Sequence, residues 1–200
     1  MSDRNATLVT LEPCDVFLTR GAGFVSRAIR VFTRRFGESR TKVNHVGIIV
    51  GEGTMVTAMA IEALVKVRKH PLGRYARKLD TAVAVYRPIN LTEGEETAIV
   101  AKALSYEGDK YGIVKIAAHF VDWTLQGAYV FRRLTRMDDY PICSWLVAHA
   151  FASGGKDFGC EPGAATPDDI WDFVTTNPDK YVQVHPLVPI GMNESAATAQ

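Results

Sequence analysis

The sequence changes character at Pro88, and this change limits the folds open to the chain. Before Pro88, short runs rich in β-branched and apolar residues are separated by glycines, a pattern typical of strands joined by turns. After Pro88, most apolar residues recur at helical spacing. We therefore predict an α+β fold in which a small antiparallel sheet packs against helices.

The first part of the chain contains one strong hairpin signal. Two β-rich runs within 43–60 flank Gly51-Glu52-Gly53, and glycines in that place favour a turn between paired strands. Two helical segments are also expected there, an amphipathic helix over 24–36 and a short stretch over 71–79. The predicted strands, with the hairpin runs taken together, lie at 15–19, 43–60, 63–67, 82–87 and 181–184.

The helices after Pro88 carry their own start signals. Thr92 and Glu95 form a capping box, and Thr166 followed by Pro167 marks another helix start. The predicted helices lie at 92–106, 113–134, 142–151 and 167–174.

Length and organisation indicate a single domain. A chain of 200 residues suits one domain better than two, and we find no internal repeat and no dividing linker. We predict one domain over 1–192, followed by a disordered tail over 193–200.

Composition argues against several classes of function. The 23 Lys and Arg residues nearly balance the 22 Asp and Glu residues, so net charge does not suggest a nucleic-acid binder. The three cysteines are too few and odd in number for a disulfide framework, and no pair has the spacing of metal ligands. We therefore expect no metal and no cofactor.

The sequence has neither a signal-peptide core nor an apolar run of the roughly 18 residues that a spanning helix needs. We expect a soluble protein that is cytoplasmic or delivered by a non-classical route. A local basic cluster is read either as a solvated helix face or as a surface for peripheral contact with anionic lipid. Its members are Arg27, Arg30, Arg34, Arg35, Arg40 and Lys42.

Cys143 is the first candidate for chemistry. It lies just inside a helix that begins after Pro141, where unpaired N–H groups and the helix dipole stabilise a thiolate. The same N–H groups can act as an oxyanion hole. The alternative is a buried structural cysteine, because free cysteine is among the most buried residue types.

His45 is the candidate base for this nucleophile. It enters an apolar strand, and Gly47 leaves open space beside the imidazole on the same strand face. A cysteine nucleophile needs a base held within hydrogen-bonding reach by rigid backbone. The alternative is a structural histidine of the strand.

Four short motifs follow one another in a recognisable order. They are Pro13-Cys14-Asp15-Val16, Asn44-His45-Val46-Gly47-Ile48, Gly108-Asp109-Lys110-Tyr111-Gly112 and Cys143-Ser144-Trp145-Leu146-Val147. In these motifs the chain resembles the NlpC-type cell-wall peptidase superfamily, in particular the permuted branch in which the histidine precedes the cysteine. That branch includes the YiiX-like bacterial proteins and the lecithin:retinol acyltransferase relatives. The resemblance implies a circularly permuted papain-like fold.

The chain departs from the family pattern at two positions. Cys14 stands where the family has glycine, and Trp145 stands where glutamate is frequent. The resemblance also places Tyr111 near the active site, where its hydroxyl would help to hold substrate or oxyanion; the alternative is an ordinary half-buried tyrosine. Asp15 is expected either to touch a substrate amine or to cap backbone, and structural capping is the preferred interpretation.

The third member of the triad is left open between two residues. The resemblance implies a polar side chain on the next strand that orients His45. Spacing across the hairpin and matching parity favour Thr57, provided that Glu52 is the apex. Chemistry favours Glu62, because a carboxylate stabilises imidazolium better than a hydroxyl does, but Glu62 requires a bulge or a longer loop.

The resemblance implies a thiol hydrolase with a Cys143–His45 acyl-enzyme mechanism. The leading substrate is a peptide amide, such as a peptidoglycan stem peptide, and the alternative is an acyl-lipid ester or lipid-like amide handled by a hydrolase or acyltransferase. A competing class is a binding module that kept the fold and lost turnover, which the replacements at Thr57 and Trp145 support.

Overall fold

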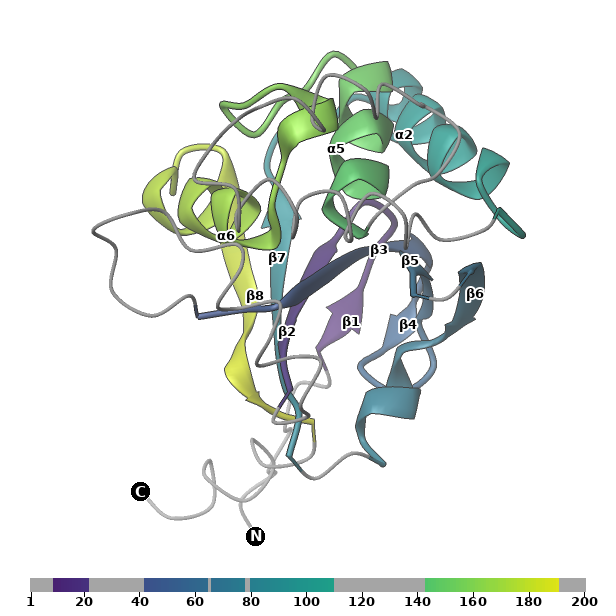
Figure 1. Cartoon of the computed structure of the whole chain (residues 1–200), viewed down its shortest axis with the longest axis vertical. Helices are drawn as coiled ribbons and strands as arrows, with labels where there is room; N and C mark the ends of the chain where they lie inside the picture. The colour runs from purple at the N-terminus through teal and green to yellow at the C-terminus, as the bar shows by residue number, and fades with distance from the viewer. Residues whose placement is uncertain (1–8, 22–41, 65, 78–79, 110–142, 191–200) are drawn as a thin grey trace, which may run out of the picture.

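The computed structural model describes residues 9–21, 42–64, 66–77, 80–109 and 143–190, and these form an α+β arrangement. Helices α2, α5 and α6 lie over one face of an antiparallel sheet (Figure 1). The strands are β1 (Thr10–Leu11), β2 (Val16–Arg20), β3 (His45–Gly51), β4 (Gly53–Thr54), β5 (Met59–Ala63), β6 (Val67–Pro71), β7 (Ala82–Pro88) and β8 (Tyr181–Pro189). The helices are α2 (Glu93–Ser105), α5 (Cys143–Ser153) and α6 (Pro167–Thr176), with short 3₁₀ turns η1 (Leu72–Tyr75) and η2 (Pro162–Ala164).

The main sheet of the described residues has six strands in the order β6-β5-β3-β2-β7-β8, and every neighbouring pair is antiparallel. A separate two-stranded ribbon joins β1 to β4. This order places β3, which begins at His45, between β2 and β5 in the interior of the sheet. His45 itself pairs with Thr19 of β2, whereas the pairing of β3 with β5 runs from Ile48 to Gly51.

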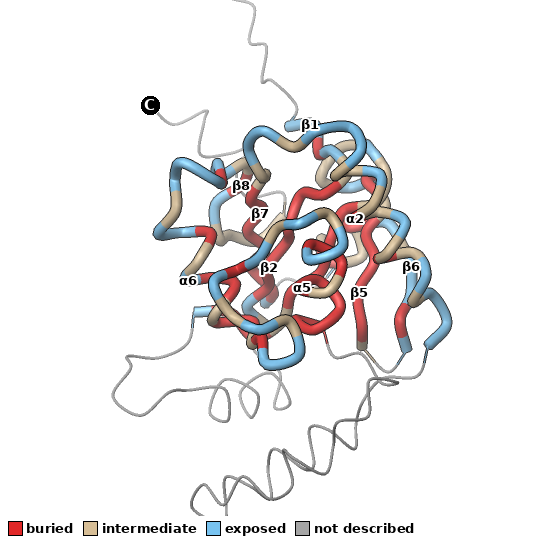
Figure 2. The backbone as a smooth tube through the Cα atoms, turned by 90° about the horizontal axis from the view of Figure 1, so that it is seen from above, coloured by how far each residue is buried: buried red, intermediate tan, exposed pale blue. Residues whose placement is uncertain are grey.

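Apolar side chains alternate along the strands and fill both faces of the sheet. On the helical face, Val46 and Ile48 of β3 pack with Leu146 and Phe151 of α5 in the larger cluster. On the other face, a smaller cluster lies against η1 and the β1–β4 ribbon. Its buried members are Leu11, Phe17, Ile49, Ala58, Ala60, Leu72, Tyr75, Val83 and Val85. Figure 2 shows the resulting band of buried backbone through β2, β5 and α5.

The predicted hairpin has a longer connection than the sequence suggested. The strand that follows Glu52 directly is β4, and it pairs with β1. Strand β3 therefore pairs with the next strand, β5. The register also shifts between Ile49 and Gly51, where β3 carries a bulge. One extra residue on one strand reverses which residues of the two strands share a face. The prediction of a hairpin with its apex at Glu52 therefore gives the wrong register for β3 and its partner strand β5.

The helix starts that were predicted from capping residues are confirmed. Thr92 caps α2 in a complete capping box with Glu95, and Thr166 caps α6 in the same way, with Pro167 in the first turn. The helical stretch expected over 71–79 is reduced to the single 3₁₀ turn η1. The strand predicted over 63–67 is wrong in its placement, because residue 63 ends β5 and β6 only begins at Val67.

Several predictions concern parts of the chain outside the described residues. These are the helices over 24–36 and 113–134, the position of Tyr111, most of the basic cluster and the tail over 193–200. The division into one domain and a tail likewise stays a prediction. In the part of the chain that is described, no helix has the length and apolar character required to cross a membrane.

Candidate active site

Cys143 lies at the first residue of α5 and is buried, with 6% of its surface exposed. Backbone N–H groups of Val46 and Ser144 donate hydrogen bonds to its sulfur. The buried hydroxyl of Ser144 donates to the carbonyl of Ala165 over 2.6 Å and so ties this first helical turn to the segment before α6. The sulfur is thus fixed where a helix N-terminus meets the start of β3.

His45 is the first residue of β3, and its backbone follows directly from a well-anchored neighbour. Asn44 is buried, and its N–H donates to the carbonyl of Thr19 over 2.9 Å. The space that Gly47 was expected to leave open is filled by the ring of Phe17, which also meets the imidazole edge-on at 6.4 Å between ring centroids. The expectation of open space is therefore wrong: Gly47 makes room for Phe17, and Phe17 in turn packs against His45.

The thiol of Cys143 and the imidazole of His45 form a hydrogen-bonded pair. Burial opposes the imidazolium, but the charges of Cys143 and Glu62 outweigh it and raise the pKa of His45 to about 10. Burial also opposes the thiolate, yet the charge and hydrogen bond of His45 lower the pKa of Cys143. Both shifts favour a thiolate–imidazolium ion pair over the neutral pair near pH 7.

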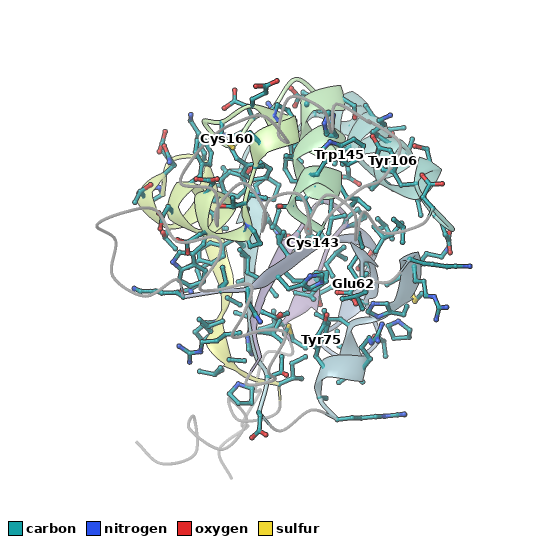
Figure 3. The ribbon with its side chains drawn as sticks, viewed as in Figure 1. Glu62, Tyr75, Tyr106, Cys143, Trp145 and Cys160 are labelled. Atoms are coloured by element: carbon teal, nitrogen blue, oxygen red, sulfur yellow. The ribbon has the colours of Figure 1, made fainter. Side chains whose placement is uncertain are left out.

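Glu62 on β5 is the partner of His45 on the side away from the sulfur. Its side chain is fully buried, and its Oε2 atom lies 2.5 Å from Nε2 of His45. Because Nε2 is engaged by the carboxylate, Nδ1 is the ring nitrogen left for the thiol. In Figure 3, Glu62 lies between Cys143 and Tyr75, whereas Cys160 is far from all three.

The Glu62 carboxylate accepts from several donors besides His45. Tyr75 donates its hydroxyl to Oε2 over 2.5 Å, while His70 and Arg74 approach Oε1 at 2.6 Å and 3.4 Å. Burial alone would raise the pKa of Glu62, but His45 and the hydrogen bonds from His70 and Tyr75 hold that pKa well below its ordinary value. Burial and the neighbouring charge of Glu62 raise the pKa of Tyr75, so that it stays a donor. Glu62 is therefore an ionised and tightly held carboxylate.

No known family model matches the sequence, and no curated protein is significantly similar to it. The interpretation of the site depends on its own geometry.

Of the two candidates for the third position, the structure brings Glu62 to His45 and leaves Thr57 elsewhere. Thr57 is exposed, and its Oγ1 atom accepts from the backbone N–H of Thr54 over 3.0 Å within the turn after β4. The register of β3 with β5, set by the bulge after Ile49, puts Glu62 on the same sheet face as His45. The assignment of Thr57 to the orienting position is wrong on this geometry.

Asp15 is engaged in the interior and does not reach the pair. Arg87 donates from Nε to Oδ1 and from Nη2 to Oδ2, both over 2.8 Å, and the N–H of Glu12 donates to Oδ2 over 2.9 Å. Asp15 precedes Val16, which pairs with Ile48, while His45 pairs with Thr19 at the other end of β2. These contacts agree with the preferred interpretation of Asp15 as a structural cap, and they occupy both of its carboxylate oxygens.

The sequence alone did not predict three of the neighbours of Glu62, namely His70, Arg74 and Tyr75. The signal that would have found His70 is the alternation along β6, whereas Arg74 and Tyr75 lie in the turn η1. With Glu62 opposite Arg68 and Ala60 opposite His70, both β6 residues share the face of Glu62. The strand predicted over 63–67 ends before residue 70, so His70 was not part of any predicted helix or strand.

The other two cysteines do not join the site. Cys14 is fully buried in the left-handed region, at φ 68°, and burial raises its pKa to about 12. All three cysteines are free thiols. Within the described ranges, no cluster of His, Cys, Asp or Glu side chains is arranged to hold a metal ion.

Proposed function

We propose that the chain is a cysteine hydrolase that cleaves an amide bond through an acyl-enzyme. The observation that carries the proposal is the continuous line of contacts from the Cys143 sulfur through His45 to the buried carboxylate of Glu62. A nucleophile bonded to a base, with the base oriented by a third group, is the arrangement that activates thiols in hydrolases.

The chemistry follows from the ion pair. The Cys143 thiolate attacks the carbonyl carbon, and the N–H groups at the start of α5 stabilise the oxyanion. The His45 imidazolium then gives its proton to the leaving nitrogen, so the amine departs and a thioester remains. A water molecule attacks the thioester, His45 takes the proton of that water, and the acid leaves with the thiolate restored. Throughout, Glu62 acts as a positioning residue on His45.

The charge state of His45 favours an amide over an ester. An amine is a poor leaving group unless it is protonated, whereas an alkoxide leaves more readily. A base whose pKa is raised to about 10 holds its proton at neutral pH and delivers it when the C–N bond breaks. The tight hold of Glu62 on Nε2 keeps that proton donor oriented.

For the fold we propose the circularly permuted papain-like arrangement. A strand histidine comes before the helix-borne cysteine in the chain, as in the permuted branch that the sequence resembles. An antiparallel sheet, with the nucleophile at the N-terminus of a helix packed on it, further supports the proposal.

Reactivity of the thiol is the first test. Limited alkylation with iodoacetamide at pH 6, followed by peptide mass spectrometry, is expected to label Cys143 before Cys14 or Cys160. The selectivity should disappear in His45→Ala, whose thiol has lost the charge that lowers its pKa. Equal labelling of Cys143 in the wild type and in His45→Ala would contradict the proposal.

Substrate class is the second test. Incubation with pooled muropeptides, and separately with phospholipid vesicles, should give new amine-bearing peptide products or a Cys143 acyl adduct only with the peptides. Release of fatty acid or transfer of an acyl chain would assign the site to acyl-lipid chemistry instead. A reactive Cys143 that turns over neither pool would favour the binding module.

A further inference from the structure

Two histidines hold the Glu62 carboxylate from opposite sides. Strand β5 lies between β3 and β6, and each of these neighbours supplies one histidine to the same face. His45 contacts Oε2, and His70 contacts Oε1 at 2.6 Å. Both contacts are diagonal across the strand pairs, which is within reach of long side chains. His45 therefore contacts one oxygen of the carboxylate and His70 the other.

Both ring nitrogens of His70 face acceptors. Nε2 faces Glu62, and Nδ1 lies 3.0 Å from the carbonyl oxygen of Pro71. A carbonyl oxygen only accepts, and an ionised carboxylate only accepts, so a neutral ring donates to one of the two and an imidazolium donates to both. The side chain of His70 is only 13% exposed, which limits competition from water. His70 is thus placed as a donor to Glu62.

We propose that His70 is a positioning residue for the catalytic pair: it fixes the Glu62 carboxylate so that Oε2 stays aimed at Nε2 of His45. This proposal rests on the proposed function as a cysteine hydrolase. It adds a residue that acts on the nucleophile through two other side chains. His70 orients Glu62, Glu62 orients and stabilises the His45 imidazolium, and the imidazolium stabilises the Cys143 thiolate.

The charged and titratable groups around this chain of contacts come from three elements, η1, β6 and α5. Tyr75 and Arg74 of η1 face Glu62 together with His70. Arg68 of β6 shares the same sheet face, opposite Glu62. Cys143 of α5 faces His45 from the far side.

Two opposite effects of removing His70 can be separated by their sign. If His70 acted only as a nearby positive charge, its removal would make the His45 imidazolium easier to form, and the His45 titration would move to higher pH. If His70 positions Glu62, its removal weakens the Glu62–His45 bond, and the titration moves to lower pH. Only the second direction agrees with the proposal.

The variants are His70→Phe, which keeps a ring and removes both hydrogen bonds, and His70→Gln, whose amide N–H reaches the place of Nε2. The readouts are the histidine side-chain ¹⁵N titration of His45 and the pH dependence of Cys143 alkylation by iodoacetamide. In His70→Phe we expect the His45 titration to fall by about one pH unit, with an approximately tenfold slower alkylation at pH 6. In His70→Gln we expect the His45 titration and the rate of Cys143 alkylation to stay close to their wild-type values.

Lys69→Gln is the matched control, because Lys69 is the neighbouring β6 residue and pairs only loosely with Glu107 at 3.9 Å. If His70→Phe does not fold, His70→Asn replaces it, since the shorter amide reaches the Nδ1 position and not Glu62. An unchanged or raised His45 titration in a folded variant would overturn the proposal. A wild-type Cys143 without selective reactivity would instead overturn the proposed function, so the two failures are distinguishable.

Discussion

His45 and Glu62 are in hydrogen-bonding contact although they do not lie opposite each other in the sheet. The pairing of Ile48 with Ile61 places Gly47 level with Glu62, and His45 lies two residues earlier in β3. The contact is thus a diagonal one, closed by the length of the glutamate side chain. A shorter acid at position 62 would not make it.

Replacement of Glu62 by glutamine tests the role of the negative charge. Glu62→Gln keeps the size of the side chain but turns one acceptor oxygen into a donor that faces donors of its neighbours. We expect the pKa of His45 to fall, Cys143 alkylation at pH 6 to slow at least about tenfold, and the free energy of unfolding to drop by about 3 kcal/mol. Iodoacetamide kinetics and urea unfolding measure these effects.

Thr57→Val is the control for that experiment, because the Thr57 hydroxyl bonds only within its own turn among the described contacts. It should cost at most about 1 kcal/mol of stability and leave the alkylation rate unchanged. A slower Cys143 in Thr57→Val, with a normal rate in Glu62→Gln, would return the orienting role to Thr57.

The ion pair predicts a flat-topped dependence of stability on pH. His45, with its pKa raised from 6.5 to about 10, contributes stability that is complete below pH 6.5 and is lost as the pH rises toward 10. Cys143, with its pKa lowered from 9.0, contributes stability that is complete above pH 9.0 and is lost as the pH falls below it. Between pH 6.5 and 9.0 the two changes oppose each other, because folding then transfers a proton within the pair without net uptake.

The pair's contribution to the free energy of unfolding should therefore rise up to pH 6.5, stay level to pH 9.0 and fall between 9.0 and about 10. Each limb has a limiting slope of about 1.4 kcal/mol per pH unit. Urea unfolding of the wild type and of Cys143→Ser measures this contribution. The rise below pH 6.5 and the fall above pH 9.0 should both become smaller when the thiolate is removed. Identical curves for the two proteins would exclude the ion pair.

Gly47→Ala tests the packing beside His45. A Cβ atom at position 47 would lie 2.4 Å from two ring atoms of Phe17 and 2.9 Å from the carbonyl oxygen of Ile61. The ring must move, so we expect a loss of about 2 kcal/mol in unfolding free energy and a changed Cys143 alkylation rate, because Phe17 packs against His45. Phe17→Leu added to Gly47→Ala should recover part of the stability. No recovery would place the strain at the Ile61 backbone instead.

Arg87→Met tests the structural role of Asp15. The variant leaves a fully buried carboxylate without its bidentate partner, so we expect a loss of about 3 kcal/mol at pH 7. Burial already raises the pKa of Asp15 despite Arg87, and without Arg87 the group should take up a proton more easily. The loss should therefore be smaller at pH 4 than at pH 7, and Asp15→Asn in the same chain should reduce it. The rate of Cys143 alkylation should stay unchanged, whereas a slower rate would point to a part for Asp15 in the site.

Sequence alone predicted the features that depend on neighbouring residues. The caps of α2 and α6 were found because Thr92 with Glu95, and Thr166 with Pro167, act within one helical turn. The pairing of Cys143 with His45 was proposed from their chemical context and from a family resemblance. These signals do not depend on how distant strands are aligned.

Features that depend on strand register were not predictable in the same way. The choice between Thr57 and Glu62 depended on a bulge at the end of β3, and no residue type at that place indicates a bulge. His70 was missed because β6 begins four residues later than the predicted strand did. Asp15 was correctly preferred as a structural cap, but its partner Arg87 lies 72 positions away in the chain.

The bulge in β3 links the register of that strand to the chemistry of the site. Val50 is the unpaired residue between Ile49 and Gly51. In a regular pairing continued from Gly51 and Met59, Val50 would lie opposite Ala60 and Ile48 opposite Glu62, which would place His45 and Glu62 on opposite faces of the sheet. The contact that helps to ionise Cys143 therefore depends on a single residue of β3, Val50, being left out of the pairing.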